Sequence, residues 1–300
     1  MSAPLTSSGP WPAIAPGARI AVIAPSGPFD REKFELGLSV LRSRYDVEMR
    51  ADIYTREGYL AGTDERRAEE LNHALSDPRI DAILTARGGY GAMRLLPHLD
   101  LSPLARRPKL LVGFSDITAL HAQWTIAGVG SLHATMVAKL GGAPPALQQR
   151  WLDAMEGRFA RTIGDLVPLT KGRAEGRLFG GNLATLCALL GTRFAPPFSG
   201  GVLFLEDVGE RPYRLDRLLT TLRLAGHLHQ VSAIVVGQFT DSIPGADGVS
   251  APDVLRKCLS DLPCPVVMDL QSGHLDDNLE LAFGRHVGVD ADPGSLTLLD

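Results

Sequence analysis

Short apolar runs alternate with amphipathic stretches through residues 1–140. The runs have the length of buried strands, and the stretches carry apolar residues at the spacing of one helix face. The predicted strands lie at residues 19–24, 81–85 and 110–114, and the predicted helices at residues 30–44, 64–75 and 116–125. Asp30 stands where a side chain that caps a helix N-terminus is expected. This alternation predicts a largely parallel sheet covered by helices.

The pattern weakens over residues 141–173, where turn-forming residues are frequent and no clear period remains, and we interpret this segment as an interdomain connection. Beyond it, strands are predicted at 202–205, 233–236 and 265–268, and helices at 182–190, 214–225 and 252–260. We therefore expect an α/β protein of two domains. Residues 1–140 form an N-terminal parallel-sheet domain with flanking helices, and residues 174–300 form a smaller C-terminal α/β domain rich in strands.

Composition is that of an ordinary soluble globular protein. Of the 300 residues, 45% are hydrophobic and 21% are charged, and the formal net charge is -4. No run of Lys or Arg offers a stripe for nucleic-acid phosphates, and no apolar run approaches the roughly 18 residues of a membrane span. The first residues lack the basic and apolar regions of a secretory signal. We expect a cytoplasmic protein with no nucleic-acid or membrane partner.

The cysteines give no sign of a disulfide framework or a metal site. Cys187, Cys258 and Cys264 form an odd set without CxxC spacing, and no His or Cys partners stand at zinc-ligand spacing around them. Such cysteines are typical of buried thiols in a reducing compartment. No metal ligands are therefore predicted.

Three polar residues follow apolar, strand-like runs, which is where α/β proteins form their sites. These residues are Ser115, Glu206 and His274. A hydroxyl, a carboxylate and an imidazole brought together supply a nucleophile, an orienting group and a base. The sequence therefore predicts a serine hydrolase whose triad runs in the chain order Ser, Glu, His.

The segment Gly113-Phe-Ser-Asp116 lies at a predicted turn from strand to helix. In a nucleophile elbow of this kind the Ser oxygen is exposed, and the next N–H points to where an oxyanion forms. The segment departs from G-x-S-x-G, because Ile117 replaces the second Gly. The local sequence alone favours a helix N-cap as the explanation of Ser115.

Arg87-Gly-Gly-Tyr-Gly91 lies at another junction of strand and helix. Its glycines permit close backbone approach and positive φ, so that its N–H groups can line a pocket. The segment matches neither the dinucleotide-binding nor the P-loop glycine pattern. It could supply an oxyanion-hole N–H, bind an anion or serve only as a tight turn.

Glu206 is costly to bury unless it is paired. An ion pair with Arg211, Arg214 or Arg217 is the alternative to a triad role, and Asp207 and Glu210 compete for that role.

Among the other histidines, His133 is a second candidate base and His286 lies in a strand-like run. Those on or beside predicted helices are expected at the surface or at helix caps: His73, His98, His121, His227 and His229.

A series of short motifs spreads over most of the chain: Ala24-Pro-Ser-Gly27, Ala86-Arg-Gly-Gly-Tyr-Gly91, Gly113-Phe-Ser-Asp116, Gly180-Gly-Asn-Leu183, Leu205-Glu-Asp-Val-Gly-Glu-Arg-Pro-Tyr-Arg214 and Gly273-His274. In the order and spacing of these motifs the chain resembles the LD-carboxypeptidase family of serine peptidases. It departs at Leu281-Ala-Phe-Gly284 and Leu132-His-Ala-Thr-Met136, where relatives tend to have Pro-Leu-Gly and His-Gly-Pro. These departures concern pocket shape rather than the triad.

The resemblance implies an N-terminal nucleophile domain and a C-terminal domain that supplies Glu and His. By this likeness Ser115 matches the family nucleophile, Glu206 the triad carboxylate and His274 the triad base. The family also implies a cytoplasmic homodimer that needs neither metal nor organic cofactor. The activity it implies is release of the terminal D-alanine from a murein tetrapeptide, in peptidoglycan recycling.

The resemblance further implies that the N–H of Asp116 and one N–H of the Gly88-Gly89 turn form the oxyanion hole. A carboxypeptidase must also hold the free carboxylate of its substrate, and an Arg fork suits that task. The candidates are Arg87, Arg211 and Arg214, and the sequence does not choose among them.

Two other functions stay open. One branch of the family resembles immunity peptidases that hydrolyse peptidyl or aminoacyl nucleotides, which need an aromatic side chain to stack on the base. Tyr90, Trp124 and Tyr213 are candidates for that role. The other function is a non-enzymatic α/β module whose Arg87–Gly91 turn grips an anion. The sequence also leaves open whether the third stem residue is diaminopimelate or lysine.

Overall fold

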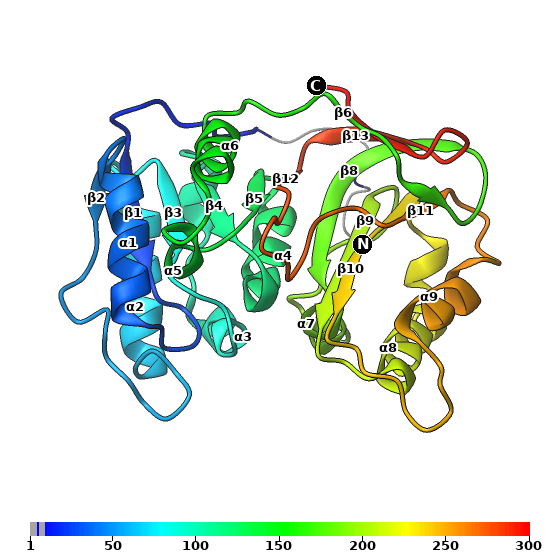
Figure 1. Cartoon of the computed structure of the whole chain (residues 1–300). Helices are drawn as coiled ribbons and strands as arrows, with labels where there is room; N and C mark the ends of the chain where they lie inside the picture. Colours follow the sequence, from blue (N-terminus) through cyan, green and yellow to red (C-terminus); the bar gives the residue numbers. More distant parts are fainter. Residues whose placement is uncertain (1–4, 6–9) are drawn as a thin grey trace. The chain divides into compact units, whose positions relative to one another are not determined.

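The computed structural model describes residue 5 and residues 10–300, which divide into two compact units (Figure 1). The Ser115 unit comprises residues 10–159 and 280–282. The His274 unit comprises Leu5 and residues 160–279 and 283–300. Each unit has its own sheet with helices packed against it, so the expected two-domain α/β architecture is confirmed.

A six-stranded sheet forms the centre of the Ser115 unit, in the order β12-β5-β4-β3-β1-β2. Its strands are β1 (Arg19–Ile23), β2 (Asp46–Glu48), β3 (Ala82–Thr85), β4 (Leu110–Gly113), β5 (Ser131–His133) and β12 (Leu281–Phe283). Strands β2, β1, β3, β4 and β5 pair in parallel, as the alternation of strand and helix predicts. Parallel pairing brings the carboxyl ends of neighbouring strands β1, β3 and β4 to one edge of the sheet.

The helices of this unit are α1 (Arg31–Arg42), α2 (Asp64–Ser76), α3 (Ala92–Leu95), α4 (Thr118–Ala127), α5 (Val137–Leu140) and α6 (Pro145–Met155). Short 3₁₀ helices are η1 (Leu96–His98), η2 (Ser102–Ala105) and η3 (Ser115–Ile117). Asp30 caps α1 as expected, because its side chain accepts a hydrogen bond from the N–H of Lys33.

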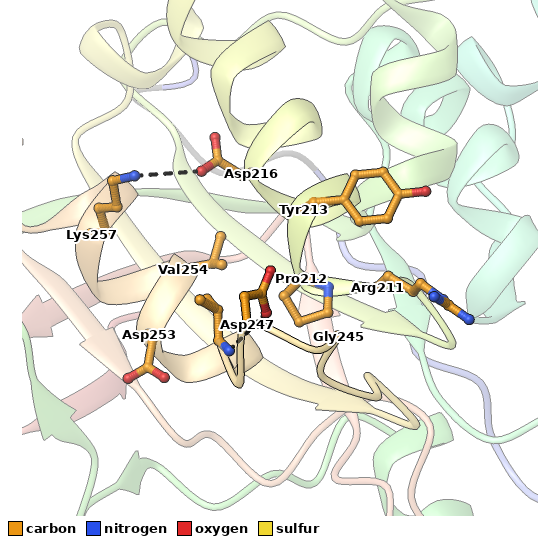
Figure 2. Close-up of a pocket in the computed structure, with 10 residues that line it drawn as sticks. Arg211, Pro212, Tyr213, Asp216, Gly245, Asp247, Asp253, Val254 and Lys257 are labelled. Atoms are coloured by element: carbon orange, nitrogen blue, oxygen red, sulfur yellow. Dashed lines mark hydrogen bonds and ion pairs between the residues drawn. The ribbon is translucent and has the colours of Figure 1, made fainter.

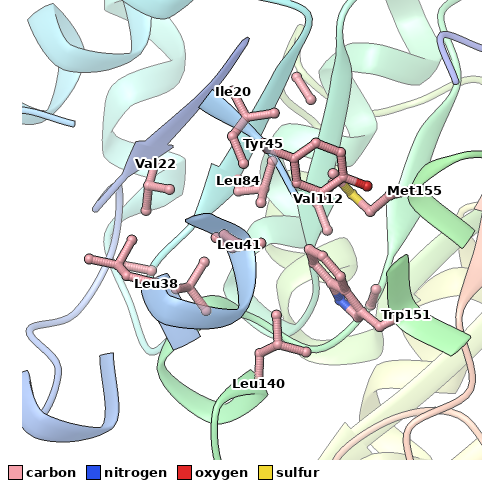
Figure 3. Close-up of a cluster of buried hydrophobic side chains, with 14 of the residues drawn as sticks. Ile20, Val22, Leu38, Leu41, Tyr45, Leu84, Val112, Leu140, Trp151 and Met155 are labelled. Atoms are coloured by element: carbon pink, nitrogen blue, oxygen red, sulfur yellow. The ribbon is translucent and has the colours of Figure 1, made fainter. Parts of the chain in front are cut away.

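Helix α6 lies in the segment that the sequence assigns to an interdomain connection, and the sequence pattern does not predict it. Its side chains Trp151 and Met155 are buried in the core of the Ser115 unit, together with Leu41 and Val112 (Figure 3). The Nε1 atom of Trp151 donates to the carbonyl oxygen of Thr135, so even its polar atom is paired.

An eight-stranded sheet forms the centre of the His274 unit, in the order β6-β14-β13-β8-β9-β10-β11-β7. Its strands are β6 (Thr162–Ile163), β7 (Val167–Pro168), β8 (Arg173–Asn182), β9 (Val202–Val208), β10 (Ala233–Thr240), β11 (Val266–Met268), β13 (His286–Asp290) and β14 (Ser295–Leu298). Strands β8 to β11 are parallel, and the outer strands on both sides are antiparallel. Glu206 lies near the carboxyl end of central strand β9.

The helices of the His274 unit are α7 (Leu183–Leu189), α8 (Pro212–Leu224) and α9 (Ala251–Leu259), with the 3₁₀ helix η4 (His227–His229). Helix α8 buries Leu215, Leu219 and Leu222, the face that its apolar spacing predicts. Gly226 takes the left-handed conformation with φ of 77° just after this helix, as expected. Among the described residues, no helix combines the length and the apolar character needed to cross a membrane.

Candidate active site

Ser115 follows β4 in a backbone conformation that is unusual for a residue with a side chain. Its φ is 64°, in the left-handed region, while Phe114 before it is extended. A non-glycine residue in this region costs of order 1–3 kcal/mol, and such residues cluster at functional sites. Ser115 is the first residue of η3, α4 follows at once, and neither helix has a side-chain cap bond at its start. A positive φ at a sharp turn from strand to helix is the backbone geometry that a nucleophile elbow requires, whereas an N-cap residue is typically extended.

The Gly88–Gly89 turn packs directly against Ser115. A Cβ atom added at Gly88 would stand 3.2 Å from Cβ and 3.4 Å from Oγ of Ser115. Gly89 has a φ of 110°, which side-chain-bearing residues rarely adopt. Glycine at both positions lets the backbone approach the hydroxyl, as an oxyanion-hole role requires.

Three charged side chains of α2 are buried, which the sequence pattern does not predict. Arg67 has no exposed surface, Glu70 is 3% exposed and Arg66 is 9% exposed. Their partners include backbone groups of the loops that follow β1 and β3. Because these contacts depend on residues far away in sequence, only the fold reveals them.

His274 and Glu206 form a close pair within the His274 unit. The Nδ1 atom of His274 lies 2.7 Å from Oε2 of Glu206, whose side chain has no exposed surface. With Nδ1–H donating to the carboxylate, Nε2 is the basic nitrogen of the ring. The pairing suits a general base and its orienting group.

Glycine precedes the imidazole because the turn leaves no room for a side chain. Gly273 has a φ of 132°, and a Cβ atom there would stand 3.1 Å from Oε2 of Glu206. The N–H of Gly273 donates to Oδ1 of Asn278, which fixes the loop that carries His274.

Asp207 and Glu210, which compete with Glu206 for the orienting role, are both paired with other groups. Arg214 pairs with Glu210. The Asp207 carboxylate accepts hydrogen bonds from Nδ2 of Asn182 and from the backbone N–H groups of Ala184 and Val208. Burial raises the pKa of Asp207 to about 6. Asp207 therefore ties β9 to the start of α7.

The structure separates the three candidate arginines. Arg87 donates to the carbonyl oxygen of Pro28, and Arg214 is committed to Glu210. Among the described residues, the guanidinium of Arg211 has no hydrogen-bond or ion-pair partner, and it lines a pocket of about 420 Å³ on the His274 unit (Figure 2).

That pocket carries groups of both signs. Besides Arg211 and the exposed Tyr213, its lining includes Asp247, Asp253 and an ion pair in which Lys257 Nζ lies 3.9 Å from Asp216 (Figure 2). Of the three arginines, Arg214 is the one paired with a carboxylate, and Arg211 is the one without a partner among the described residues.

Of the three aromatic candidates for base stacking, Trp124 is excluded by burial. It has no exposed surface, and its Nε1 donates to the carbonyl oxygen of Lys109. Tyr213 is 58% exposed and Tyr90 is 49% exposed, with the ring of Tyr59 centred 5.8 Å from that of Tyr90. Of the three candidates, Tyr90 and Tyr213 are the two that are exposed enough to stack on a planar ligand.

The expectation that His121 lies at the surface or at a cap is wrong. Its ring is buried between Oγ of Ser131 at 2.8 Å and the carbonyl oxygen of Gly113 at 2.9 Å. Burial lowers its pKa to about 4. The prediction fails because α4 is enclosed along most of its length, so it has no polar face for the ring. His121 thus supports the strand that ends beside Ser115.

Glu48, His73 and Asp77 form the one group among the described residues whose spacing could suit a metal ion, with ligand atoms within 4.8 Å of one another. Arg19 pairs with Glu48 and Arg79 pairs with Asp77, so guanidinium groups already balance the carboxylates. Nothing here points to a ligand site.

The sequence matches the models of both LD-carboxypeptidase domains, the N-terminal domain over residues 20–134 and the C-terminal domain over residues 175–289. The chain belongs to the LD-carboxypeptidase family. It is thereby a member of a family of peptidases, as the motifs predict.

Relatives of this LD-carboxypeptidase family member match nearly its whole length. A putative carboxypeptidase of Streptomyces coelicolor is 43% identical over 301 residues, covering 95% of this chain and 94% of the relative. The murein tetrapeptide carboxypeptidase of Pseudomonas aeruginosa is 35% identical over 282 residues, covering 89% of this chain and 91% of the relative.

Solved structures match the fold. A muramoyltetrapeptide carboxypeptidase from Oxalobacter formigenes has a TM-score of 0.82 at 30% identity, covering 94% of this chain and 99% of that one. The microcin self-immunity protein MccF of Escherichia coli is 27% identical over 277 residues, covering 81% of this chain and 80% of the relative. A structure of MccF with aspartyl sulfamoyl adenosine has a TM-score of 0.86 at 23% identity, covering 99% of each chain.

Proposed function

We propose that this chain is a serine carboxypeptidase that releases the terminal D-alanine from a murein tetrapeptide. The observation that carries the proposal is the positive φ of Ser115 at the turn from β4 into η3 and α4. Backbone strain of this kind persists where a reactive side chain must be held in place. The relatives named as murein tetrapeptide and muramoyltetrapeptide carboxypeptidases support the substrate class.

In the proposed reaction, His274 takes the proton of the Ser115 hydroxyl while the oxygen attacks the carbonyl carbon of the L,D bond. Glu206 holds the imidazole tautomer and stabilises the imidazolium. The backbone N–H groups of Asp116 and of the Gly88–Gly89 turn stabilise the oxyanion, each by about 3 kcal/mol. His274 then protonates the leaving amine of D-alanine, and water releases the acyl group from Ser115.

The free carboxylate of D-alanine needs a cation that is not already paired. We assign this role to Arg211, which has no hydrogen-bond or ion-pair partner among the described residues. Arg214 is ion-paired with Glu210, and Arg87 donates to the carbonyl oxygen of Pro28. A guanidinium fork binds a carboxylate through two parallel hydrogen bonds, which favours peptides with a free C-terminus.

Place and assembly belong to the same proposal. We propose a cytoplasmic homodimer that acts in peptidoglycan recycling, on the grounds of the family to which the chain belongs. Sedimentation of the purified protein tests the dimer, and fractionation of cells that produce the protein tests its location.

The experiment for the reaction is mass spectrometry of purified protein incubated with murein tetrapeptide. We expect loss of one alanine with the wild-type protein, none with Ser115→Ala, and wild-type turnover with Ser102→Ala, which changes an exposed serine of the same unit. Turnover by Ser115→Ala at the wild-type rate would refute the assignment of the nucleophile.

A second substrate class is favoured by the likeness to MccF and by the exposure of Tyr90 and Tyr213. The same assay with aspartyl sulfamoyl adenosine tests it. Cleavage of that compound without cleavage of the tetrapeptide would assign the chain to the immunity type. Cleavage of neither, with anion binding that is indifferent to Ser115→Ala, would assign it to a binding module.

A further inference from the structure

Three loops meet at the edge of the sheet where Ser115 lies. They follow the neighbouring strands β1, β3 and β4 and comprise residues 24–27, residues 86–91 and residues 114–116. The N–H of Gly27 donates to the carbonyl oxygen of Gly88 at 3.0 Å, which joins the first loop to the glycine turn. The proposed function accounts for the second and third loops but gives no role to the first.

The side chain of Asp116 connects all three loops. Its Oδ2 atom accepts a hydrogen bond from Oγ of Ser26 at 2.6 Å and from the N–H of Ala92 at 2.9 Å. Ala92 directly follows the second loop, which contains the Gly88–Gly89 turn, and Asp116 itself follows Ser115. The side chain is 5% exposed, so these bonds form away from bulk water, where they are strong.

Arg67 of α2 connects the same loops from a second direction. Its guanidinium has no exposed surface, and it donates to the carbonyl oxygen of Pro25 and to that of Gly91 at 3.0 Å. A Cβ atom at Gly91 would stand 2.7 Å from Arg67 Nη1, so the glycine permits this approach. Burying a guanidinium is costly, and its ion pair with Asp64 offsets part of that cost.

Glu70 of α2 holds the start of the first loop. Its Oε2 atom accepts a hydrogen bond from the N–H of Ala24 at 2.8 Å, and Arg66 pairs with the same carboxylate. One helix thus presents buried charges to loops on both sides of it in the sequence, through contacts between residues 24, 42 and 46 positions apart. The backbone groups of irregular loops need such partners when they are buried.

We propose that Asp116 and Arg67 are positioning residues that hold the Gly88–Gly89 turn against Ser115, so that the oxyanion donors are fixed before substrate binds. The inference rests on the proposed function of Ser115 as nucleophile. Preorganised donors stabilise the oxyanion without a cost of reorganisation during the reaction. The side chain of Asp116 therefore acts through the backbone of its own loop and of the glycine turn.

A decisive comparison uses the fact that one oxygen of Asp116 accepts both hydrogen bonds. Asp116→Asn can keep that oxygen in place, whereas Asp116→Ala removes it. We expect Asp116→Ala to lower kcat on murein tetrapeptide by about 100-fold with KM changed less than threefold, and Asp116→Asn to restore kcat to within about fivefold of wild type.

The matched control is Glu156→Ala. Glu156 is a carboxylate of the same unit with 4% of its side chain exposed, and it pairs with Arg44 away from the three loops. The Glu156→Ala substitution should lower the thermal midpoint of unfolding as Asp116→Ala does, while kcat of the folded protein stays at the wild-type value. If Asp116→Ala does not fold, Ser26→Ala removes one of the two bonds, and we expect about a tenfold loss of kcat.

The rate at which a fluorophosphonate labels Ser115 separates this inference from the proposed substrate. It depends on the oxyanion donors but not on recognition of the tetrapeptide, and Arg67→Lys and Asp116→Ala should both slow it by at least tenfold. If the wild-type protein is labelled but leaves the tetrapeptide intact, the proposed substrate is wrong. The labelling rates of the variants then still test whether Asp116 and Arg67 position the oxyanion donors. Labelling and kcat that fall no further in Asp116→Ala than in Glu156→Ala would overturn the inference.

Discussion

The Nδ1 atom of His274 lies 2.7 Å from Oε2 of Glu206, a carboxylate with no exposed surface. The other oxygen of Glu206, Oε1, has no hydrogen-bond partner among the described residues. A buried carboxylate with so few donors around it is costly in free energy. A role in orienting the imidazole and stabilising its protonated form explains why a carboxylate is buried at this position.

Replacing Glu206 by Gln keeps the shape and removes the charge. We expect Glu206→Gln to lower kcat by about 10³–10⁴-fold, because the amide cannot hold the productive tautomer or stabilise the imidazolium. Steady-state kinetics with murein tetrapeptide measures this. Glu210→Gln, in the loop that follows β9, is the control. A Glu206→Gln enzyme within threefold of wild type would remove Glu206 from the mechanism.

The strain at Ser115 predicts an unusual order of stabilities. Since φ is 64°, Ser115→Gly should be more stable than Ser115→Ala by about 1 kcal/mol, although both lack the nucleophile. Chemical denaturation of the two variants measures the difference. The same pair at Ser131, in strand β5, should show the opposite order, with Gly the less stable. Equal stability at position 115 would argue against stored strain.

Arg211 and Arg214 offer a matched pair for recognition of the substrate carboxylate. We expect Arg211→Ala to raise KM at least tenfold, because a charge-assisted pair with the C-terminal carboxylate is lost. Arg214→Ala should change KM less than twofold, since Arg214 is already paired with Glu210. Titration of the two variants with tetrapeptide and with its C-terminal amide distinguishes them. Equal effects of both variants would count against the assignment.

Buried His121 predicts a loss of stability in acid. Its folded pKa is lowered to about 4 from an unfolded value of about 6.5. The unfolded chain therefore binds a proton first, so the contribution is complete above pH 6.5 and is lost as the pH falls towards 4. Between pH 7.5 and 4.5 the loss from this group is about 2–3 kcal/mol.

His121→Gln should make the free energy of unfolding less dependent on pH over that window by a similar amount. Urea titrations of both proteins at several pH values measure the difference. If the two pH profiles run parallel, His121 is not the buried neutral group that the structure describes.

Local sequence is sufficient to predict the helices and strands whose apolar spacing and end signals lie within the element itself. The apolar spacing of α8 and the left-handed Gly226 after it both follow from local physics. The sequence pattern does not predict helix α6, although Pro145 at its first turn is a common start signal and the buried Trp151 and Met155 are spaced i, i+4 on one helix face.

The site is predictable in part for the same reason. Residue type and position after a predicted strand indicate Ser115, Glu206 and His274 as candidates. The positive φ of Ser115 cannot be predicted from the residues next to it in the sequence. The burial of Arg67 was hidden because charged residues on a helix are ordinarily exposed. Its partners, Pro25 and Gly91, become neighbours only once β1 and β3 pair.

The most direct test of the central claim is peptide mapping by mass spectrometry after partial reaction with a fluorophosphonate, with turnover of murein tetrapeptide followed in the same samples. The account predicts one adduct, on the peptide that contains Ser115, and turnover that falls in proportion to the labelled fraction. Full turnover with Ser115 completely labelled, or loss of turnover through an adduct on another residue, would contradict it.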